Sequence, residues 1–220
     1  MKRLVIFDLD GTLLNTIEDL GRAANHALEV NGFPTHSVAS YPFFVGNGVR
    51  KLIERVLPED INKETVIDKM LADFKVYYNE HNTDYTVPYP GICDMLEWLQ
   101  EEEVKIAVAS NKYDQATQKL IRHFFPKINF AAIEGQKEGI PVKPDPSIVF
   151  SILAQAKEKK ADTLYVGDSG VDMETARRAC IDSVGVTWGF RPEKELVEYH
   201  AGQIVNTPLE IEKIVEQYIG

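Results

Sequence analysis

The stretch Leu4-Val5-Ile6-Phe7-Asp8-Leu9-Asp10-Gly11-Thr12 places four apolar residues directly before two carboxylates and a glycine. An unbroken apolar run that ends at a glycine is typical of a strand buried on both faces, as in a parallel sheet covered by helices. Because side chains alternate along a strand, Asp8 and Asp10 are predicted on one side, about 7 Å apart along the backbone. Ligands of open α/β sheets bind at the carboxyl ends of strands, which predicts a site here. A plain strand-ending turn, which aspartate and glycine also favour, is the alternative.

The composition of the chain limits the partners it can have. Its 220 residues include 24 Lys and Arg against 34 Asp and Glu, a formal net charge of −10. Such an excess of acid repels nucleic acid and anionic membranes, so neither is expected as a partner, and an anionic substrate needs a local positive field. The first apolar run is too short for a signal peptide, and no later run is long enough to span a membrane. We therefore expect a soluble cytoplasmic protein, a monomer or a homodimer.

The two cysteines, Cys93 and Cys180, have no metal-binding or redox spacing. We expect both to be small packing residues in a reducing compartment and not partners in a disulfide.

Residues 15–87 show helical periodicity and no convincing strand. Thr16 with Asp19 resembles a capping box at the start of the first of these helices. The predicted helices cover residues 17–31, 52–57 and 66–78. This block therefore reads as a helical insertion placed directly behind the first strand.

From residue 90 onward, strand and helix patterns alternate. The predicted strands are 104–109, 129–133, 163–166, 182–186 and 204–205, and the predicted helices are 91–98, 115–125, 146–156, 173–180 and 209–218. Alternation with short connections favours a parallel sheet with helices on both faces. We therefore expect an α/β fold with a Rossmann-like, doubly wound parallel sheet as its core.

Polar residues stand where the turns of this predicted sheet converge. They are Ser110 and Asn111 after one strand, Lys143 before a helix, and Asp168 and Asp172 after a further strand. A hydroxyl, a lysine and the free N–H groups of a helix start suit phosphate oxygens. Carboxylates suit a hard divalent cation, of which octahedral Mg²⁺ is the natural choice. Together with Asp8 and Asp10, these acids would repel one another without a metal.

Each of these residues also has an ordinary structural interpretation. Ser110 or Asn111 could cap the helix that follows. Asp168 and Asp172 could complement a helix dipole, and Lys143 could be a solvated surface lysine. The convergence of four separate turns on one sheet edge favours a common site over these separate roles.

These motifs, in this order along the whole chain, resemble those of the haloacid dehalogenase-like hydrolase superfamily. The resemblance implies that Asp8 attacks phosphorus and forms an aspartyl-phosphate, and that Asp10 acts first as general acid and then as general base. It further implies a phosphate-binding set of Ser110, Asn111 and Lys143, and a Mg²⁺ site formed by Asp8, the backbone carbonyl of Asp10, Asp168 and Asp172. Members that cleave carbon–halogen bonds lack an acid at the position of Asp10, so a dehalogenase is disfavoured.

The helical insertion resembles the cap domain of one branch of this superfamily. The implied division is an α/β core of residues 1–14 and 88–220 with an all-helical cap of residues 15–87. Residues 45–50 are similar to a loop of phosphoglycolate phosphatase-like members, in which the glycines or Arg50 would contact substrate.

Three observations leave this part of the resemblance open. Asn47 could be an ordinary helix N-cap, and Arg50 could be a surface arginine. Asn15 stands where such sequences commonly have an aspartate.

The function that follows is a Mg²⁺-dependent phosphomonoester hydrolase for small phosphorylated metabolites, most similar to phosphoglycolate phosphatases. A phosphosugar mutase would use the same aspartyl-phosphate but return the phosphoryl group to its substrate. A phospho-accepting regulatory module also combines clustered aspartates with a hydroxyl, a lysine and Mg²⁺. Such a module needs no helical insertion and no acid poised for turnover, so it is the less favoured alternative.

Overall fold

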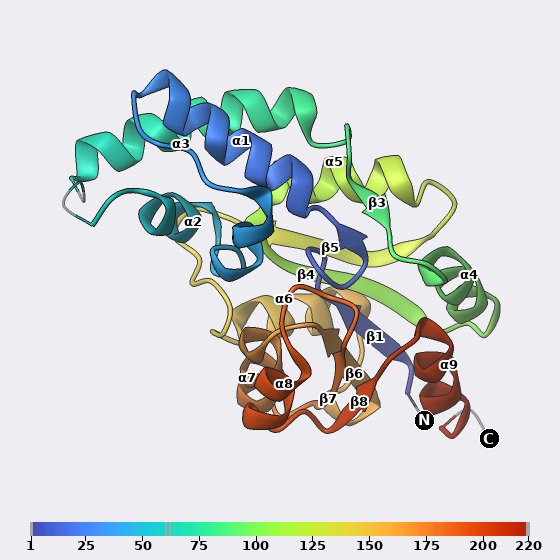
Figure 1. Ribbon diagram of the computed structural model, residues 1–220. Coiled ribbons are helices and arrows are strands. Elements are labelled where there is room, and N and C mark those ends of the chain that lie inside the picture. The colour runs from blue at the N-terminus through green and yellow to red at the C-terminus, as the bar shows by residue number, and fades with distance from the viewer. Residues whose placement is uncertain (1, 60, 62, 219–220) are drawn as a thin grey trace.

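Six parallel strands form a twisted sheet through the centre of the molecule (Figure 1). This computed structural model describes residues 2–59, 61 and 63–218. The strands are β1 (Leu4–Phe7), β4 (Lys105–Tyr113), β5 (Phe130–Gln136), β6 (Thr163–Gly167), β7 (Asp182–Val186) and β8 (Gln203–Val205). Their order is β5-β4-β1-β6-β7-β8, so the sheet extends in both directions from β1. This is the strand order of a doubly wound Rossmann-like sheet, and the predicted fold class is confirmed.

Strand β1 is covered on both faces, as its unbroken apolar run predicts. Val5 and Phe7 belong to one hydrophobic cluster, whereas Leu4 and Ile6 belong to another on the opposite face. The first cluster includes α4 (Ile92–Glu101), α5 (Asp114–Phe124) and α9 (Pro208–Glu216), and the second includes α6 (Ser147–Ala156) and α7 (Gly170–Ala179). Because neighbouring strand residues point to opposite faces, only a run without polar residues can occupy this position.

The register of the central strands determines which residues share the carboxyl edge. Phe7 at the end of β1 pairs with Val108 of β4 and with Val166 of β6. The residues that follow these three positions therefore lie side by side at this edge of the sheet. The order of connections reverses at β1, and such a switch point is where open α/β sheets bind ligands.

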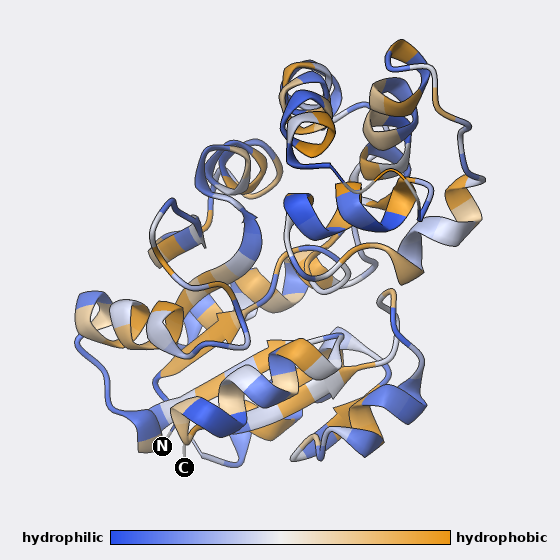
Figure 2. Ribbon diagram, turned by 90° about the vertical axis from the view of Figure 1, so that its left-hand side faces the viewer, coloured by the Kyte–Doolittle hydropathy of each residue, from blue (hydrophilic) through white to orange (hydrophobic). Residues whose placement is uncertain are grey.

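A separate group of helices lies over this carboxyl edge (Figure 1). It consists of α1 (Ile17–Val30), the 3₁₀ helix η1 (Val38–Phe43), α2 (Val49–Val56) and α3 (Glu64–His81), and we call it the helical unit. These helices bury a hydrophobic cluster that is almost entirely their own. In Figure 2 they stand apart from the sheet, whose strands are the most continuously hydrophobic segments. Two short antiparallel strands, β2 (Leu14–Asn15) and β3 (Val87–Pro88), pair where the chain enters and leaves this unit.

Several local predictions are wrong. Thr16 precedes α1, but its side chain makes no cap hydrogen bond. Strand β4 continues to Tyr113, so neither Ser110 nor Asn111 caps α5. Three short helices were not predicted, because none is long enough to show a periodic pattern. They are η1, η2 (Lys160–Asp162) and α8 (Glu193–Glu198).

Cys93 and Cys180 are exposed free thiols, so the prediction that they are packing residues is wrong. Each stands on the outer side of an element whose apolar neighbours face the sheet, at the first turn of α4 and just after α7. In the part of the chain that the structure describes, every helix is too short or too polar to cross a bilayer.

Candidate active site

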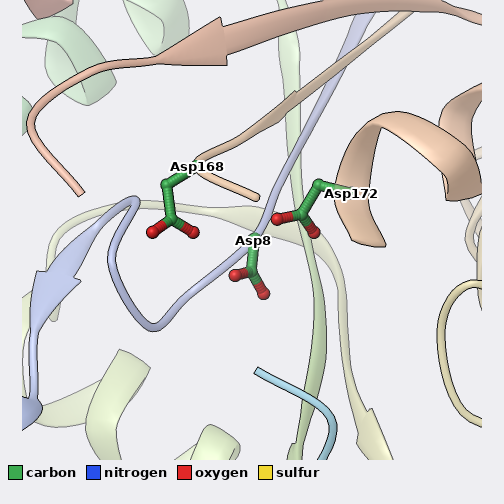
Figure 3. Close-up of side chains that lie close together, drawn as sticks. All are labelled: Asp8, Asp168 and Asp172. Atoms are coloured by element: carbon green, nitrogen blue, oxygen red, sulfur yellow. The ribbon is translucent and has the colours of Figure 1, made fainter. Parts of the chain in front are cut away.

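Three buried carboxylates converge at the switch point of the sheet. Asp8 follows β1, Asp168 follows β6, and Asp172 lies in the first turn of α7. Figure 3 shows the three side chains pointing into one space, and one oxygen of each lies within 4.8 Å of the others. The predicted convergence of these acids is therefore present in the folded chain.

A capping box holds Asp172 in place. Ser169 is the N-cap of α7, and its hydroxyl donates a 2.6 Å hydrogen bond to Oδ2 of Asp172. The backbone N–H of Ser169 also donates to this oxygen, at 3.2 Å. In return, Oγ of Ser169 accepts a 3.4 Å hydrogen bond from the N–H of Asp172. Such reciprocal bonds satisfy N–H groups that the first turn of a helix leaves free. Oδ1 of Asp172 remains directed toward the site.

Lys143 is the buried cation of this cluster. Its Nζ lies 2.7 Å from Oδ1 of Asp8 and 2.8 Å from Oδ1 of Asp172. It also donates to the carbonyl of Ala109 at 2.9 Å and lies 3.1 Å from the hydroxyl of Tyr165. A buried lysine needs such partners, because leaving an ammonium unpaired away from water is costly. The alternative of a solvated surface lysine is wrong.

Burial and mutual repulsion shift the pKa values of these groups. Burial raises the pKa of Asp8 to about 7, against the opposing influence of Lys143. Burial, together with the neighbouring Asp172 and Asp8, raises the pKa of Asp168 well above its usual range. Burial alone would lower the pKa of Lys143, but Asp172 and Asp8 outweigh it and raise that pKa. These shifts reflect the cost of placing three carboxylates and one ammonium in the same buried space.

The donor set matches a hard divalent cation. Three carboxylates share the space with one ammonium, so a doubly charged ion would balance the remaining charge. Oxygen ligands of this kind are those that Mg²⁺ and Ca²⁺ take in proteins. The residues that could hold the ion by their side chains are Asp8, Asp168 and Asp172.

Asp10 lies apart from this cluster. Its Oδ1 accepts a 2.6 Å hydrogen bond from the hydroxyl of Thr16 and lies 3.1 Å from Nζ of Lys112. The chain has already left β1 at this point, so Asp8 and Asp10 are not alternate residues of a strand as predicted. The four carboxylates were expected to share one cation, but the structure brings together only Asp8, Asp168 and Asp172. The position of the Asp10 side chain is compatible with the second predicted role of this residue, in which its backbone carbonyl binds the metal.

Ser110 and Asn111 occupy different positions relative to the site. Ser110 is buried at the pocket and its Oγ accepts a 3.1 Å hydrogen bond from the N–H of Lys112. The side chain of Asn111 bonds both the N–H and the carbonyl of Lys143, at 2.8 and 3.1 Å. Its amide also donates to the carbonyl of Gly46 at 3.2 Å. Both amide hydrogens are thus used within the protein, so Asn111 positions Lys143 and its side chain has none left for a phosphate.

The carboxylates open into a pocket between the sheet edge and the helical unit. Besides the acids, its lining includes residues that the sequence analysis missed, namely Leu20, Tyr78, Lys112, Tyr113, Phe190 and Arg191. Most of these are apolar or aromatic residues, whose periodic patterns signal only a helix or a core. The wall that the helical unit supplies is largely apolar, since it includes Leu20, Leu52 and Phe74.

The turn after β7 also belongs to the site. The N–H of Phe190 donates a 2.7 Å hydrogen bond to Oδ2 of Asp168. A Cβ at Gly189 would lie 2.3 Å from Cβ of Asp168 and 2.4 Å from the carbonyl oxygen of Gly11. Only glycine fits at such a close approach. The sequence signal was a glycine shortly after a predicted strand end, which alone indicates no more than a turn.

The loop of residues 45–50 contributes its glycines to the pocket, but Arg50 points away from it. Gly46 and Gly48 line the pocket, whereas Arg50 pairs with Glu64 and Asp68 of α3. The N-cap of α2 is Gly48, so the N-cap role predicted for Asn47 is wrong. The side chain of Asn47 instead accepts a 2.6 Å hydrogen bond from Arg55.

We predict that Arg50→Ala leaves substrate recognition unchanged. The arginine contacts only acids on the outer surface of the helical unit, so kcat/KM should stay within about twofold for 2-phosphoglycolate and for 4-nitrophenyl phosphate. Steady-state kinetics on both esters measures this. Arg191→Ala is the matched comparison, because Arg191 lines the pocket and donates to the carbonyl of Val45. A loss confined to 2-phosphoglycolate in the Arg50 variant would contradict the structure.

The fold and the site define an α/β enzyme with an acidic centre at the switch point of a doubly wound sheet. Residues 5–186 match the family model described as haloacid dehalogenase-like hydrolase. The chain belongs to this family.

Relatives support the same assignment. A phosphoglycolate phosphatase of Pseudomonas syringae pv. tomato is 30% identical over 212 residues, which cover 94% of this chain and 77% of that protein. A phosphoglycolate phosphatase of Aquifex aeolicus is 32% identical, with 86% of each chain covered. A crystal structure from Lactobacillus delbrueckii subsp. bulgaricus, provisionally named phosphoglycolate phosphatase, superposes with a TM-score of 0.91 at 33% identity over 98% of this chain and 99% of that one. The predicted superfamily and enzyme class, a phosphatase, are confirmed.

Proposed function

We propose that this chain is a Mg²⁺-dependent phosphomonoester hydrolase that acts on small phosphorylated metabolites through an aspartyl-phosphate. A substrate of the 2-phosphoglycolate type is supported by the names of its relatives. The observation that carries the proposal is Lys143, whose Nζ lies between Oδ1 of Asp8 and Oδ1 of Asp172. One ammonium thus stands beside the candidate nucleophile and beside a candidate metal ligand.

Asp8 is the proposed nucleophile. Its carboxylate attacks phosphorus and displaces the ester oxygen, and water then hydrolyses the resulting acyl phosphate. Mg²⁺ held by Asp8, Asp168, Asp172 and the backbone carbonyl of Asp10 would neutralise charge on the phosphoryl oxygens. Lys143 adds a point charge on the same side, and the hydroxyl of Ser110 donates to a phosphoryl oxygen.

Asp10 is the proposed proton carrier. An alkoxide is a poor leaving group, so a carboxylic acid that donates a proton to the ester oxygen lowers the barrier of the first step. The resulting carboxylate then takes a proton from the attacking water. The separation of Asp10 from the three other acids supports this division of roles, because its carboxylate does not share the proposed cation.

The helical unit is the proposed cap. Residues 15–87 would form this cap, and residues 1–14 and 88–220 the catalytic core. The division is supported by the hydrophobic cluster that these helices bury among themselves and by the β2–β3 pair at the crossing. Because the unit supplies one wall of the pocket, it would select the leaving group while the core carries out the chemistry.

Release of inorganic phosphate tests the proposal. With Mg²⁺, the purified chain should liberate phosphate steadily from 2-phosphoglycolate or from another member of a panel of phosphorylated metabolites. Turnover without added bisphosphate separates a hydrolase from a phosphosugar mutase, and turnover beyond one equivalent separates it from a phospho-accepting module. A complete lack of phosphate release across the panel would refute the proposal.

A further inference from the structure

Lys112 is a buried cation between the core and the helical unit. Its Nζ lies 3.1 Å from Oδ1 of Asp10 and donates a 2.7 Å hydrogen bond to the hydroxyl of Tyr78 in α3. The ammonium also stands over the Tyr78 ring, 4.6 Å from its centroid. The side chain of Lys112 is 3% exposed. The reaction scheme above assigns no task to this lysine.

The contacts of Asp10 show what such a cation can do. Thr16 and Lys112 both contact Oδ1 of Asp10, and together they hold its carboxylate. A carboxylate that exchanges a proton with an ester oxygen must point at that oxygen, and a misplacement of about 1 Å can cost about 100-fold in rate. With Lys112 removed, Asp10 would keep only one of these two partners and its side chain could rotate.

We propose that Lys112 is a positioning residue that orients the carboxylate of Asp10 and makes this orientation depend on the docked helical unit. This inference rests on the proposed function. The dependence follows from the shared ammonium, since Lys112 belongs to the core strand β4 whereas Tyr78 belongs to α3. If α3 moves away, Lys112 loses the partner that holds its own side chain beside Asp10. Proton transfer by Asp10 therefore requires that the helical unit is docked and closes the pocket.

Leaving groups distinguish this role from a merely structural one. An alkyl ester needs a proton from Asp10 to leave, whereas 4-nitrophenolate leaves without one. The value of kcat/KM reports only the steps through release of the alcohol or phenol, so the later use of Asp10 as a base does not enter it. An effect on the orientation of Asp10 should therefore appear with alkyl esters only.

The test is Lys112→Met, which keeps the length of the side chain and removes the charge. General acid catalysis typically accelerates a reaction by about 10²–10⁴-fold. We expect misorientation of Asp10 to remove part of this acceleration, so that kcat/KM of the variant falls by about 10- to 100-fold for 2-phosphoglycolate and for β-glycerol phosphate. For 4-nitrophenyl phosphate the loss should stay below about threefold. Tyr78→Phe removes only the hydroxyl that accepts from Lys112, and should show the same preference for alkyl esters with a smaller loss.

Lys119→Met is the matched control. Lys119 is an exposed lysine of α5 that also reaches α3, where its Nζ donates to the carbonyl of Asn79. This contact lies outside the network of Asp10, so the control should keep its activity on all three esters.

Three results would overturn the inference. Equal losses of Lys112→Met on alkyl and aryl esters would indicate a structural defect. Full activity on alkyl esters would show that Asp10 needs no such support. A loss on 2-phosphoglycolate but not on β-glycerol phosphate would make Lys112 a ligand of the substrate carboxylate. Failure of the unmodified protein to release phosphate from any ester is a different result, which would remove the proposed function itself.

Discussion

Asp8→Asn should reduce turnover by roughly four orders of magnitude or more, because an amide cannot serve as the nucleophile and the other groups cannot replace it. The substitution also removes one candidate ligand of the metal. Phosphate release under steady-state conditions measures the loss, and trapping of radiolabelled phosphate on the denatured protein measures the covalent intermediate. A loss of only a fewfold would exclude Asp8 as the attacking group.

Stability serves as the control for this variant. Burial raises the pKa of Asp8 to about 7, above the 3.8 of a free aspartate side chain. Because the folded state then binds the proton more tightly than the unfolded state, ionisation of Asp8 lowers the stability of the metal-free protein progressively between about pH 4 and pH 7. Asparagine cannot ionise, so above pH 7 the metal-free variant should unfold at a temperature no lower than that of the unmodified protein. A clearly lower temperature would attribute the lost activity to misfolding.

Removal of divalent metal should abolish activity, and Mg²⁺ should restore it. The cluster of Asp8, Asp168 and Asp172 offers oxygen ligands only, with a negative charge that Lys143 does not balance. We expect Ca²⁺ to restore little activity, because it takes more ligands at longer distances and would misplace the nucleophile. Assays after treatment with EDTA and dialysis, with each ion added back, measure this. Full activity in metal-free buffer would contradict both the metal site and most of the mechanism.

Binding of Mg²⁺ can also be followed without activity. A ligand at about 100 times its Kd adds about 2.7 kcal/mol to the folded state, which corresponds to about 5–10 °C in Tm for a chain of this size. The shift should be larger at pH 8 than at pH 5, because at pH 5 protons compete for the buried Asp8. Asp172→Asn should reduce the shift, whereas Arg50→Ala, on the outer surface, should leave it unchanged.

The sequence by itself was sufficient for the architecture of the core. The run Leu4–Phe7 has no polar residue, and only a strand covered on both faces can bury such a run. Because parallel strands share one carboxyl edge, the acids after Phe7 and after the strand that ends at Gly167 had to meet there. In this part of the chain, the residues that predict the strands also predict which acids meet at the edge of the sheet.

Only the tertiary structure shows which side chains far apart in the chain contact one another. Lys143 and Asp8 are 135 residues apart, and although the order of motifs marks Lys143 as a candidate, no local pattern shows that it is buried against Asp8. Lys112 carries no local signal either, and its role depends on a tyrosine from the helical unit. Arg50 is the opposite case. The motif of residues 45–50 suggested that it contacts substrate, but the acids of α3 hold it on the surface. Spacing along the chain contains no information on such contacts.

The two capping-box patterns show the physical reason. Thr16 with Asp19 and Ser169 with Asp172 have the same spacing, yet only the second pair forms the box. The hydroxyl of Thr16 donates instead to Asp10, and Asp19 accepts from the backbone N–H groups of Tyr85 and Thr86. In a capping box the oxygen of the N-cap side chain accepts a hydrogen bond from a backbone N–H, and this geometry needs an extended N-cap backbone. Ser169 is extended, with φ −130° and ψ 160°, whereas Thr16 is not, with φ −103° and ψ 3°. Sequence determines which bonds are possible locally, whereas the folded chain decides which competing partner is close enough to form one.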